Sequence, residues 1–204
     1  MKVAIIGSGG REHALCDSLK KSSKVNKIYC IPGNAGTDLI AENVKIELND
    51  FEAIKEFIKL NAIDLVLVGP EKPLVEGIVD FLEKHNVKVF GPNKIASQLE
   101  GSKAFTKNLC KKYNIPTANF GIFEDSKSAL NFLKSCNLPI VIKADGLASG
   151  KGVYICEKKE EYIEAVKEIF GGKFGEAKQI LIEEFLKGEE MSFFVICDGE
   201  NYQK

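Results

Sequence analysis

Short apolar runs alternate with amphipathic segments along the first 92 residues of the chain. Strands are expected over residues 2–6, 27–31, 64–68 and 87–90, and the apolar stretches in the first and third indicate strands buried in a parallel sheet. Between these runs, apolar residues recur at helical spacing over residues 11–21, 51–60 and 74–84. Regular alternation of strand and helix predicts an α/β fold built on a doubly wound parallel sheet.

The pattern changes in the second half. We expect helices over residues 102–113, 126–133 and 159–170, and strands over residues 120–123, 139–143, 153–156, 179–184 and 191–197. Only a glycine-rich loop joins the strands 139–143 and 153–156, which is too short for a parallel crossover and predicts an antiparallel hairpin. The second half is therefore expected to be a separate α+β unit.

The domain organisation follows from this change of pattern. We expect an N-terminal domain over 1–100, a connecting helix and linker over 101–117, a small α+β subdomain over 118–187, and the start of a larger one over 188–204. Residues 198–201 resemble a turn, and Tyr202 begins a returning strand that is not finished. This ending predicts that the chain is part of a longer protein.

Composition excludes several classes of function. With 28 basic and 29 acidic residues the net charge is -1, which argues against a nucleic-acid binder or a polybasic membrane-surface protein. No apolar run approaches the roughly 20 residues of a spanning helix. Six scattered cysteines, with no CxxC pair and no histidine at zinc spacing, are expected to be reduced residues of a cytoplasmic protein.

The first candidate motif is the glycine-rich turn 7–13 (GSGGREH) between the first strand and the first helix. Glycines and a helix N-terminus together favour an anion. Arg11 is the only arginine among the 28 basic residues, and a guanidinium can make a forked contact with phosphate or carboxylate. Glu12 stands where a dinucleotide-binding loop has its third glycine, so a phosphate site is favoured over an NAD site, with a simple tight turn as the alternative.

Two further loops follow predicted parallel strands. They are 32–37 (PGNAGT) and 68–71 (VGPE). In open α/β sheets, ligands bind outside the carboxyl ends of the strands, so these loops share an edge with the first motif. A small phosphorylated molecule held by Arg11 would there meet Glu71 through its hydroxyl groups.

Two motifs in the second half indicate a nucleotide site. The loop 143–153 (KADGLASGKGV) lacks Walker spacing and precedes a strand, but a glycine-rich flap between antiparallel strands can fold over a triphosphate. Lys143 would place a cation on the phosphates. The segment 182–190 (IEEFLKGEE) could pair with an adenine edge and offer a carboxylate to the ribose, although a solvated acidic turn is the simpler interpretation of that segment alone.

Taken in order, the motifs GSGGREHAL, PGNAGT, VGPE, GPNKIASQLEGSKAF, IKADGLASGKGV and IEEFLKGEEMSF resemble the glycinamide ribonucleotide synthetase family of the ATP-grasp superfamily. The resemblance covers the whole chain. It implies ATP-dependent ligation of glycine to 5-phosphoribosylamine, giving glycinamide ribonucleotide, ADP and phosphate in purine biosynthesis. It also implies a pre-ATP-grasp domain, an ATP-grasp lid and the start of the larger ATP-grasp subdomain.

The resemblance also implies site residues. Those expected to face phosphoribosylamine are Gly9, Gly10, Arg11, Asn34, Gly36, Thr37 and Glu71. Catalytic lysines on the nucleotide phosphates are expected at Lys103 and Lys143. The remaining ATP-binding residues would be Ala148, Ser149, Gly150, Lys151, Gly152 and Val153 in the flap, Glu183, Phe185 and Leu186 in the adenine pocket, and Glu190 at the ribose.

The same resemblance predicts what this chain lacks. Family members are roughly twice as long, and their ligands for Mg²⁺ (or Mn²⁺) and much of the glycine site are expected beyond residue 204. The 204 residues alone are therefore expected to be inactive, and the full enzyme to be a monomer that acts on small molecules, without nucleic acid or membrane. A carboxylase-type ATP-grasp enzyme and a non-catalytic nucleotide- or phosphate-binding module are the alternatives.

Overall fold

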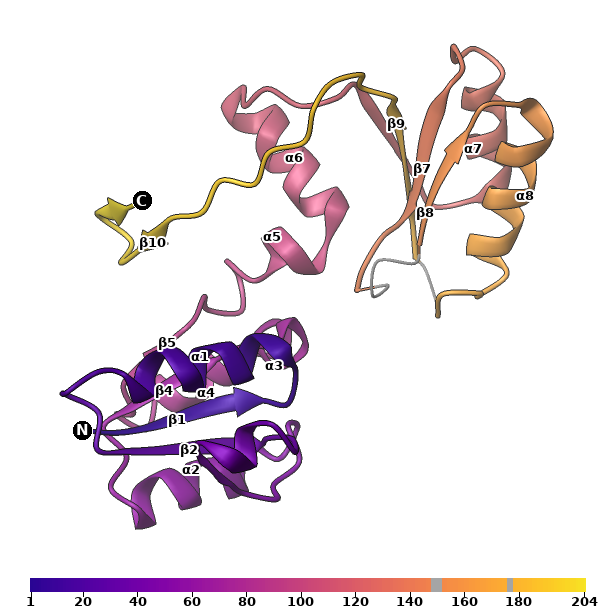
Figure 1. Ribbon diagram of the computed structural model, residues 1–204. Coiled ribbons are helices and arrows are strands. Elements are labelled where there is room, and N and C mark those ends of the chain that lie inside the picture. Colours follow the sequence, from indigo (N-terminus) through magenta and orange to yellow (C-terminus); the bar gives the residue numbers. More distant parts are fainter. Residues whose placement is uncertain (148–151, 176–177) are drawn as a thin grey trace. The chain divides into compact units, whose positions relative to one another are not determined.

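The computed structural model of the protein describes residues 1–147, 152–175 and 178–204. These residues divide into two compact units. One contains residues 1–115 with the described part of 145–152, and the other contains residues 116–144 and 153–204. Each unit has its own sheet and its own hydrophobic core, and each is described separately below (Figure 1).

The first unit is built on a five-stranded parallel sheet in the order β3-β2-β1-β4-β5. Its strands are β1 (Lys2–Gly7), β2 (Lys27–Pro32), β3 (Glu42–Asn43), β4 (Leu65–Val68) and β5 (Val89–Phe90). The central strand β1 pairs with β2 from Lys2↔Lys27 to Gly7↔Pro32 and with β4 from Val3↔Leu65 to Ile6↔Val68. This strand order places the loops after β1, β2 and β4 side by side at the carboxyl edge of the sheet.

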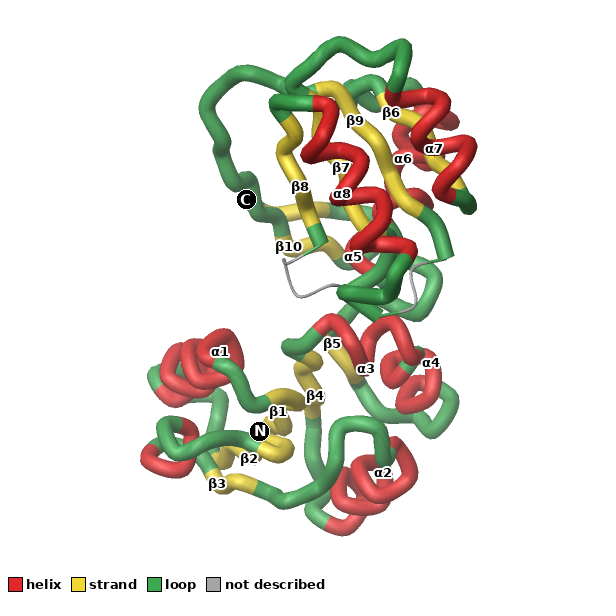
Figure 2. Tube along the Cα trace, turned by 90° about the vertical axis from the view of Figure 1, so that its right-hand side faces the viewer, coloured by secondary structure: helices red, strands yellow, loops and turns green. Residues whose placement is uncertain are grey.

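Helices cover both faces of this sheet. They are α1 (Gly10–Lys20), α2 (Phe51–Leu60), α3 (Glu71–Glu76) and α4 (Ile78–Glu83). Alternate residues of β1 belong to different cores: Val3 and Ile5 pack with Cys16 of α1, whereas Ala4 and Ile6 pack with side chains of α2 and α4. Figure 2 shows α1 on one side of the strands and α2 on the other. The predicted doubly wound sheet is thus confirmed.

The unit continues into α5 (Gln98–Gly101) and α6 (Lys103–Tyr113). Ser102 caps α6, because its Oγ accepts a hydrogen bond from Phe105 N at 3.0 Å. Asn114, with φ of 53°, ends α6 in the left-handed conformation.

The second unit has a four-stranded antiparallel sheet in the order β6-β9-β7-β8. Its strands are β6 (Phe120–Phe123), β7 (Ile140–Ala144), β8 (Val153–Cys156) and β9 (Ile180–Glu184). The helices α7 (Ser126–Leu133) and α8 (Lys159–Phe170) pack on one face, where Ala129, Val166 and Ile142 share a core. The predicted antiparallel pairing of β7 with β8 is confirmed.

The structure differs from the sequence-based prediction at two predicted elements and contains three elements that were not predicted. The single helix predicted over 74–84 is wrong: the chain forms α3 and α4, separated by Gly77, whose φ of 99° interrupts helical geometry. The strand predicted over 191–197 is limited to β10 (Ile196–Cys197), which pairs with β11 (Tyr202–Gln203) around the Asp198 turn. The 3-10 turn η1 (Thr37–Leu39), β3 and α5 were not predicted.

Among the helices of the described ranges, none has the length and apolar character that crossing a bilayer requires.

Candidate functional site

Three loops meet at the carboxyl edge of the parallel sheet, as the sequence predicted. Gly33 N donates to Gly7 O at 3.1 Å and Gly69 N donates to Ile6 O at 3.0 Å, so the loops after β2 and β4 are both hydrogen-bonded to the end of β1. Gly7 has φ of 132°, and Gly9 and Gly10 are exposed at the start of α1. Gly9 and Gly10 therefore expose part of their backbone to solvent at this edge.

Asn34 joins the second loop to the first. Its Nδ2 donates to Ser8 O at 2.8 Å, while its Oδ1 accepts from Gly36 N at 2.7 Å and from Thr37 N at 3.0 Å. The Thr37 side chain is fully buried, and its Oγ1 accepts from Asn34 N and donates to Asn43 Oδ1, both at 2.7 Å. In this structure the side chains of Asn34 and Thr37 shape the loop.

Arg11 and Glu71 form an ion pair across the edge. Arg11 Nη2 lies 2.6 Å from Glu71 Oε1, and the two side chains are 69% and 34% exposed. The hydrogen bond from Arg11 lowers the pKa of Glu71 and raises that of Arg11 itself. The two groups predicted to contact a phosphorylated ligand are therefore adjacent, and the guanidinium keeps most of its surface open to an anion.

Lys103 stands in the first turn of α6 beside the start of the glycine-rich loop. Its Nζ donates to Gly146 O at 2.9 Å. Asp145 adds a second cap to α6, because its Oδ1 accepts from Ala104 N at 3.1 Å and its Oδ2 accepts from Ser102 Oγ at 3.0 Å. Sequence reasoning did not assign Asp145, although its place directly after a strand and within a glycine-rich loop could have identified it as a capping residue.

Lys143 and Glu183 form an ion pair on the sheet of the second unit. The register aligns Lys143 with Leu181 and Val141 with Glu183, so both side chains belong to the face opposite α7 and α8. Glu183 is 3% exposed, whereas Lys143 is partly open to solvent. A cation that a phosphate could contact is thus held by a buried carboxylate.

The remaining nucleotide candidates adjoin the strands β8 and β9 in the sequence. Gly152 is buried and Val153, which begins β8, is 43% exposed. Phe185 and Leu186 follow β9 and are 36% and 64% exposed, and Glu190 is exposed in the segment after them. Ala148, Ser149, Gly150 and Lys151 lie outside the described residues.

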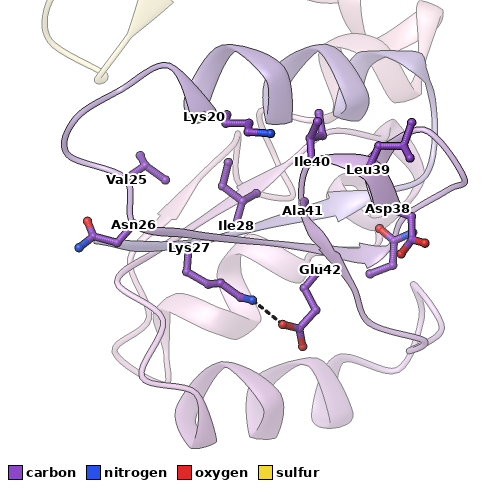
Figure 3. A pocket seen from close by; sticks show the side chains of 11 residues that line it. Lys20, Val25, Asn26, Lys27, Ile28, Asp38, Leu39, Ile40, Ala41 and Glu42 are labelled. Atoms are coloured by element: carbon purple, nitrogen blue, oxygen red, sulfur yellow. Dashed lines mark ion pairs between the residues drawn. The ribbon is translucent and has the colours of Figure 1, made fainter.

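A separate pocket of about 530 Å³ lies beside β2 and the edge strand β3 of the first sheet (Figure 3). Its walls come from the end of α1, the start of β2 and residues 38–43, and the ion pair between Lys27 and Glu42 spans it at 2.6 Å. None of the candidate site residues lines this pocket.

Comparison with known proteins identifies the family. Residues 1–100 match the family model described as phosphoribosylglycinamide synthetase, N domain, and residues 101–204 match the model for its ATP-grasp (A) domain. The chain belongs to the phosphoribosylglycinamide synthetase family. The resemblance inferred from the motifs is thereby confirmed.

Two relatives and two solved structures show how far the likeness extends. Phosphoribosylamine–glycine ligases of Mesorhizobium japonicum and Clostridium acetobutylicum are 50% and 49% identical over 98% of this chain, which covers 47% and 49% of their lengths. The crystal structure of the Thermotoga maritima ligase matches with a TM-score of 0.82 at 36% identity, over 99% of this chain and 48% of that one. The ADP complex of the N5-carboxyaminoimidazole synthetase of Staphylococcus aureus matches with a TM-score of 0.73 at 18% identity, over 91% of this chain and 47% of that one. This likeness shows a shared fold. The chain spans about half the length of the curated relatives that it matches.

Proposed function

We propose that the protein represented by this chain ligates glycine to 5-phosphoribosylamine with ATP, in the purine pathway. The observation that carries this proposal is the 49–50% identity with phosphoribosylamine–glycine ligases, which extends over 98% of the chain and so over both units. The carboxylase-type ATP-grasp enzymes share the fold at 16–22% identity, so their reaction is the weaker candidate.

The proposed reaction has two steps. The carboxylate oxygen of glycine attacks the γ-phosphorus of ATP, and ADP leaves, which gives glycyl phosphate. The amine nitrogen of phosphoribosylamine then attacks the carbonyl carbon, an amide forms and phosphate leaves. Such transfers depend on positioning and on neutralising phosphate charge, so no protein nucleophile is required.

The first unit is proposed to hold the sugar phosphate. Gly9, Gly10 and Arg11 would receive the phosphate group, because exposed glycine backbone at a helix N-terminus and a largely open guanidinium both favour an anion. Glu71 would exchange Arg11 for hydroxyl groups of the ribose. Asn34, Gly36 and Thr37 would keep the second loop in place, through the hydrogen bonds that Asn34 makes to Ser8 and to its own loop.

The second group of residues is proposed to hold ATP. Lys103 and Lys143 would turn from Gly146 O and Glu183 to the phosphate oxygens. Glu183 at the end of β9 and Phe185 and Leu186 after it would pair with adenine, and Glu190 would bind the ribose. Residues 148–153 would close over the phosphates and exclude water, which would otherwise hydrolyse an acyl phosphate.

Mg²⁺ (or Mn²⁺) is proposed for the whole enzyme, where it would neutralise charge on the phosphates of ATP. Within the described ranges, no three His, Cys, Asp or Glu side chains are grouped as a metal site would require. The family resemblance predicts the ligands of this metal beyond residue 204. We further propose that the enzyme acts in the cytoplasm as a monomer.

The test of this proposal is a reconstitution with the full-length protein. ADP formation is measured with ATP, glycine and freshly generated phosphoribosylamine, and each substrate is omitted in turn. We expect ADP and glycinamide ribonucleotide in equal amounts, and only when all three substrates are present. If ADP formation instead requires bicarbonate and an aminoimidazole ribonucleotide, the result would contradict the proposed ligase activity and support the carboxylase-type reaction.

A further inference from the structure

Glu12 is a charged side chain folded into the loop after β1. It is 4% exposed, and its Oε2 accepts a hydrogen bond from Gly9 N at 2.5 Å. A Cβ atom at Gly69 would lie 2.0 Å from Glu12 Oε1, and a Cβ atom at Gly7 would lie 2.6 Å from its Cδ. Glycine at both positions therefore makes room for this carboxylate at the edge where β1 and β4 end.

The position of Glu12 is the one that a dinucleotide-binding loop gives to its third glycine. In such a loop, the second glycine lets the pyrophosphate approach the backbone. In this chain the N–H of Gly9, the second glycine, is taken by Glu12, and a negative charge is buried beside it. Gly10 and Arg11 occupy the first two positions of α1, where N–H groups have no acceptor within the helix, so these donors stay available to one phosphate group.

We propose that Glu12 is a specificity-determining residue that restricts this loop to a single phosphate group and rejects pyrophosphate. The inference rests on the proposed function, because it takes the loop of Gly9, Gly10 and Arg11 as the sugar-phosphate site, with Gly10 and Arg11 as its donors. Glu12 acts here through its charge and through its hold on Gly9, without contact to the reacting atoms. A second phosphate would lose the Gly9 donor and would meet the buried carboxylate.

The experiment compares two ligands on the ¹⁵N-labelled 204-residue chain. Ribose 5-phosphate and inorganic pyrophosphate are titrated separately, and dissociation constants are taken from the amide signals of Gly9 and Gly10, so that binding elsewhere on the chain is not counted. Glu12→Gln keeps the size of the side chain and an oxygen that can accept from Gly9, but removes the charge. Glu12→Asp keeps the charge and shortens the side chain.

The chain offers a matched control in α8. Glu161 is also the third residue of its helix, and its Oε2 accepts from Glu157 N at 2.7 Å and from Lys158 N at 3.2 Å. Glu161→Gln therefore removes a capping charge from the other unit. A general effect of losing such a charge would appear equally in this variant.

The wild-type chain is expected to bind ribose 5-phosphate more tightly than pyrophosphate. The ratio of the pyrophosphate dissociation constant to the ribose 5-phosphate dissociation constant should fall about tenfold in Glu12→Gln. The reason is that one unit charge acts more strongly on the more highly charged anion at short range. Glu12→Asp and Glu161→Gln should leave the ratio within about twofold of wild type. If the ratio is unchanged in Glu12→Gln, or falls equally in Glu12→Asp, the role proposed for Glu12 is overturned. The proposed phosphate site would not be affected by either result. Absence of any Gly9 or Gly10 shift with ribose 5-phosphate in the wild-type chain would overturn the proposed phosphate site and this inference with it.

Discussion

Arg11 Nη2 lies 2.6 Å from Glu71 Oε1, although 60 residues separate them in the sequence. The pair forms because β1 and β4 are neighbours in the parallel sheet, so the helices that follow them, α1 and α3, begin at the same edge. Both groups are partly open to solvent, which limits what the pair contributes to stability and leaves it open to exchange with a ligand.

The first prediction concerns the titration of Glu71. The hydrogen bond from Arg11 holds the pKa of Glu71 below its ordinary value of 4.5. A carboxyl group with a lowered pKa in the folded state stabilises the fold above its unfolded pKa, and this contribution is lost as pH falls through the folded pKa. A carboxyl ¹³C titration should therefore show a pKa of Glu71 below 4.5 in the wild type, and this pKa should be higher in Arg11→Ala. Equal pKa values in the two chains would contradict the pair.

The second prediction concerns binding by Arg11. In the full-length protein, Arg11→Ala should raise the Michaelis constant for phosphoribosylamine and leave that for ATP unchanged. Losing a charged hydrogen bond costs about 1.5–3 kcal/mol, or roughly 10- to 150-fold. Lys20→Ala, which removes the same charge from the last turn of α1, is the control. If both variants change the Michaelis constant equally, the effect belongs to net charge and not to the guanidinium.

The third prediction separates stability from nucleotide binding at Lys143. Lys143 pairs with Glu183, which is 3% exposed, and a hydrogen bond to a charged group contributes about 1.5–3 kcal/mol, so Lys143→Ala should lower the free energy of unfolding by about that amount. The double variant Lys143→Met with Glu183→Leu should recover stability but not ATP affinity. Denaturant unfolding and calorimetry measure the two effects. If the double variant binds ATP with wild-type affinity, the assignment of Lys143 to the nucleotide site is contradicted.

Much of the fold could be predicted because its elements are long and regular. The pattern over 159–170 gives α8 to the residue, and the short glycine-rich loop after 139–143 leaves antiparallel pairing as the only arrangement for β7 and β8. The break at Gly77 was missed because Leu74, Ile78 and Leu82 keep helical spacing across it. Periodicity reports which residues are buried, and it does not report a local change of φ.

The candidate residues could be predicted one by one, but their partners could not. Lys143 was recognised as a cation at the end of a strand, whereas its pairing with Glu183 depends on the register between β7 and β9. Glu12 was recognised only as a departure from the dinucleotide pattern. Its burial against Gly7 and Gly69 depends on two loops that are far apart in sequence.

The fourth prediction concerns the double cap of α6. Asp145 accepts from both Ala104 N and Ser102 Oγ, so Asp145→Ala should destabilise the chain by about 1 kcal/mol. It should also weaken ATP binding in the full-length protein, because Lys103 is in the turn that Asp145 caps. Asp125→Ala, which removes the cap of α7, should lower the melting temperature without changing ATP affinity. A loss of ATP affinity in both variants would assign the effect to stability.

The fifth prediction concerns the cysteines, whose reactivity depends on the thiolate. Burial raises the pKa of Cys16 to about 12 and that of Cys156 to about 11, so almost no thiolate is present at pH 8. Cys197 is exposed on β10. Iodoacetamide at pH 8 should therefore modify Cys197 first, and should reach Cys16 and Cys156 only in denaturant, as measured by peptide mass spectrometry. Cys197→Ser should remove the fast phase, and rapid native labelling of Cys16 would show that the contact of α1 with the sheet opens readily.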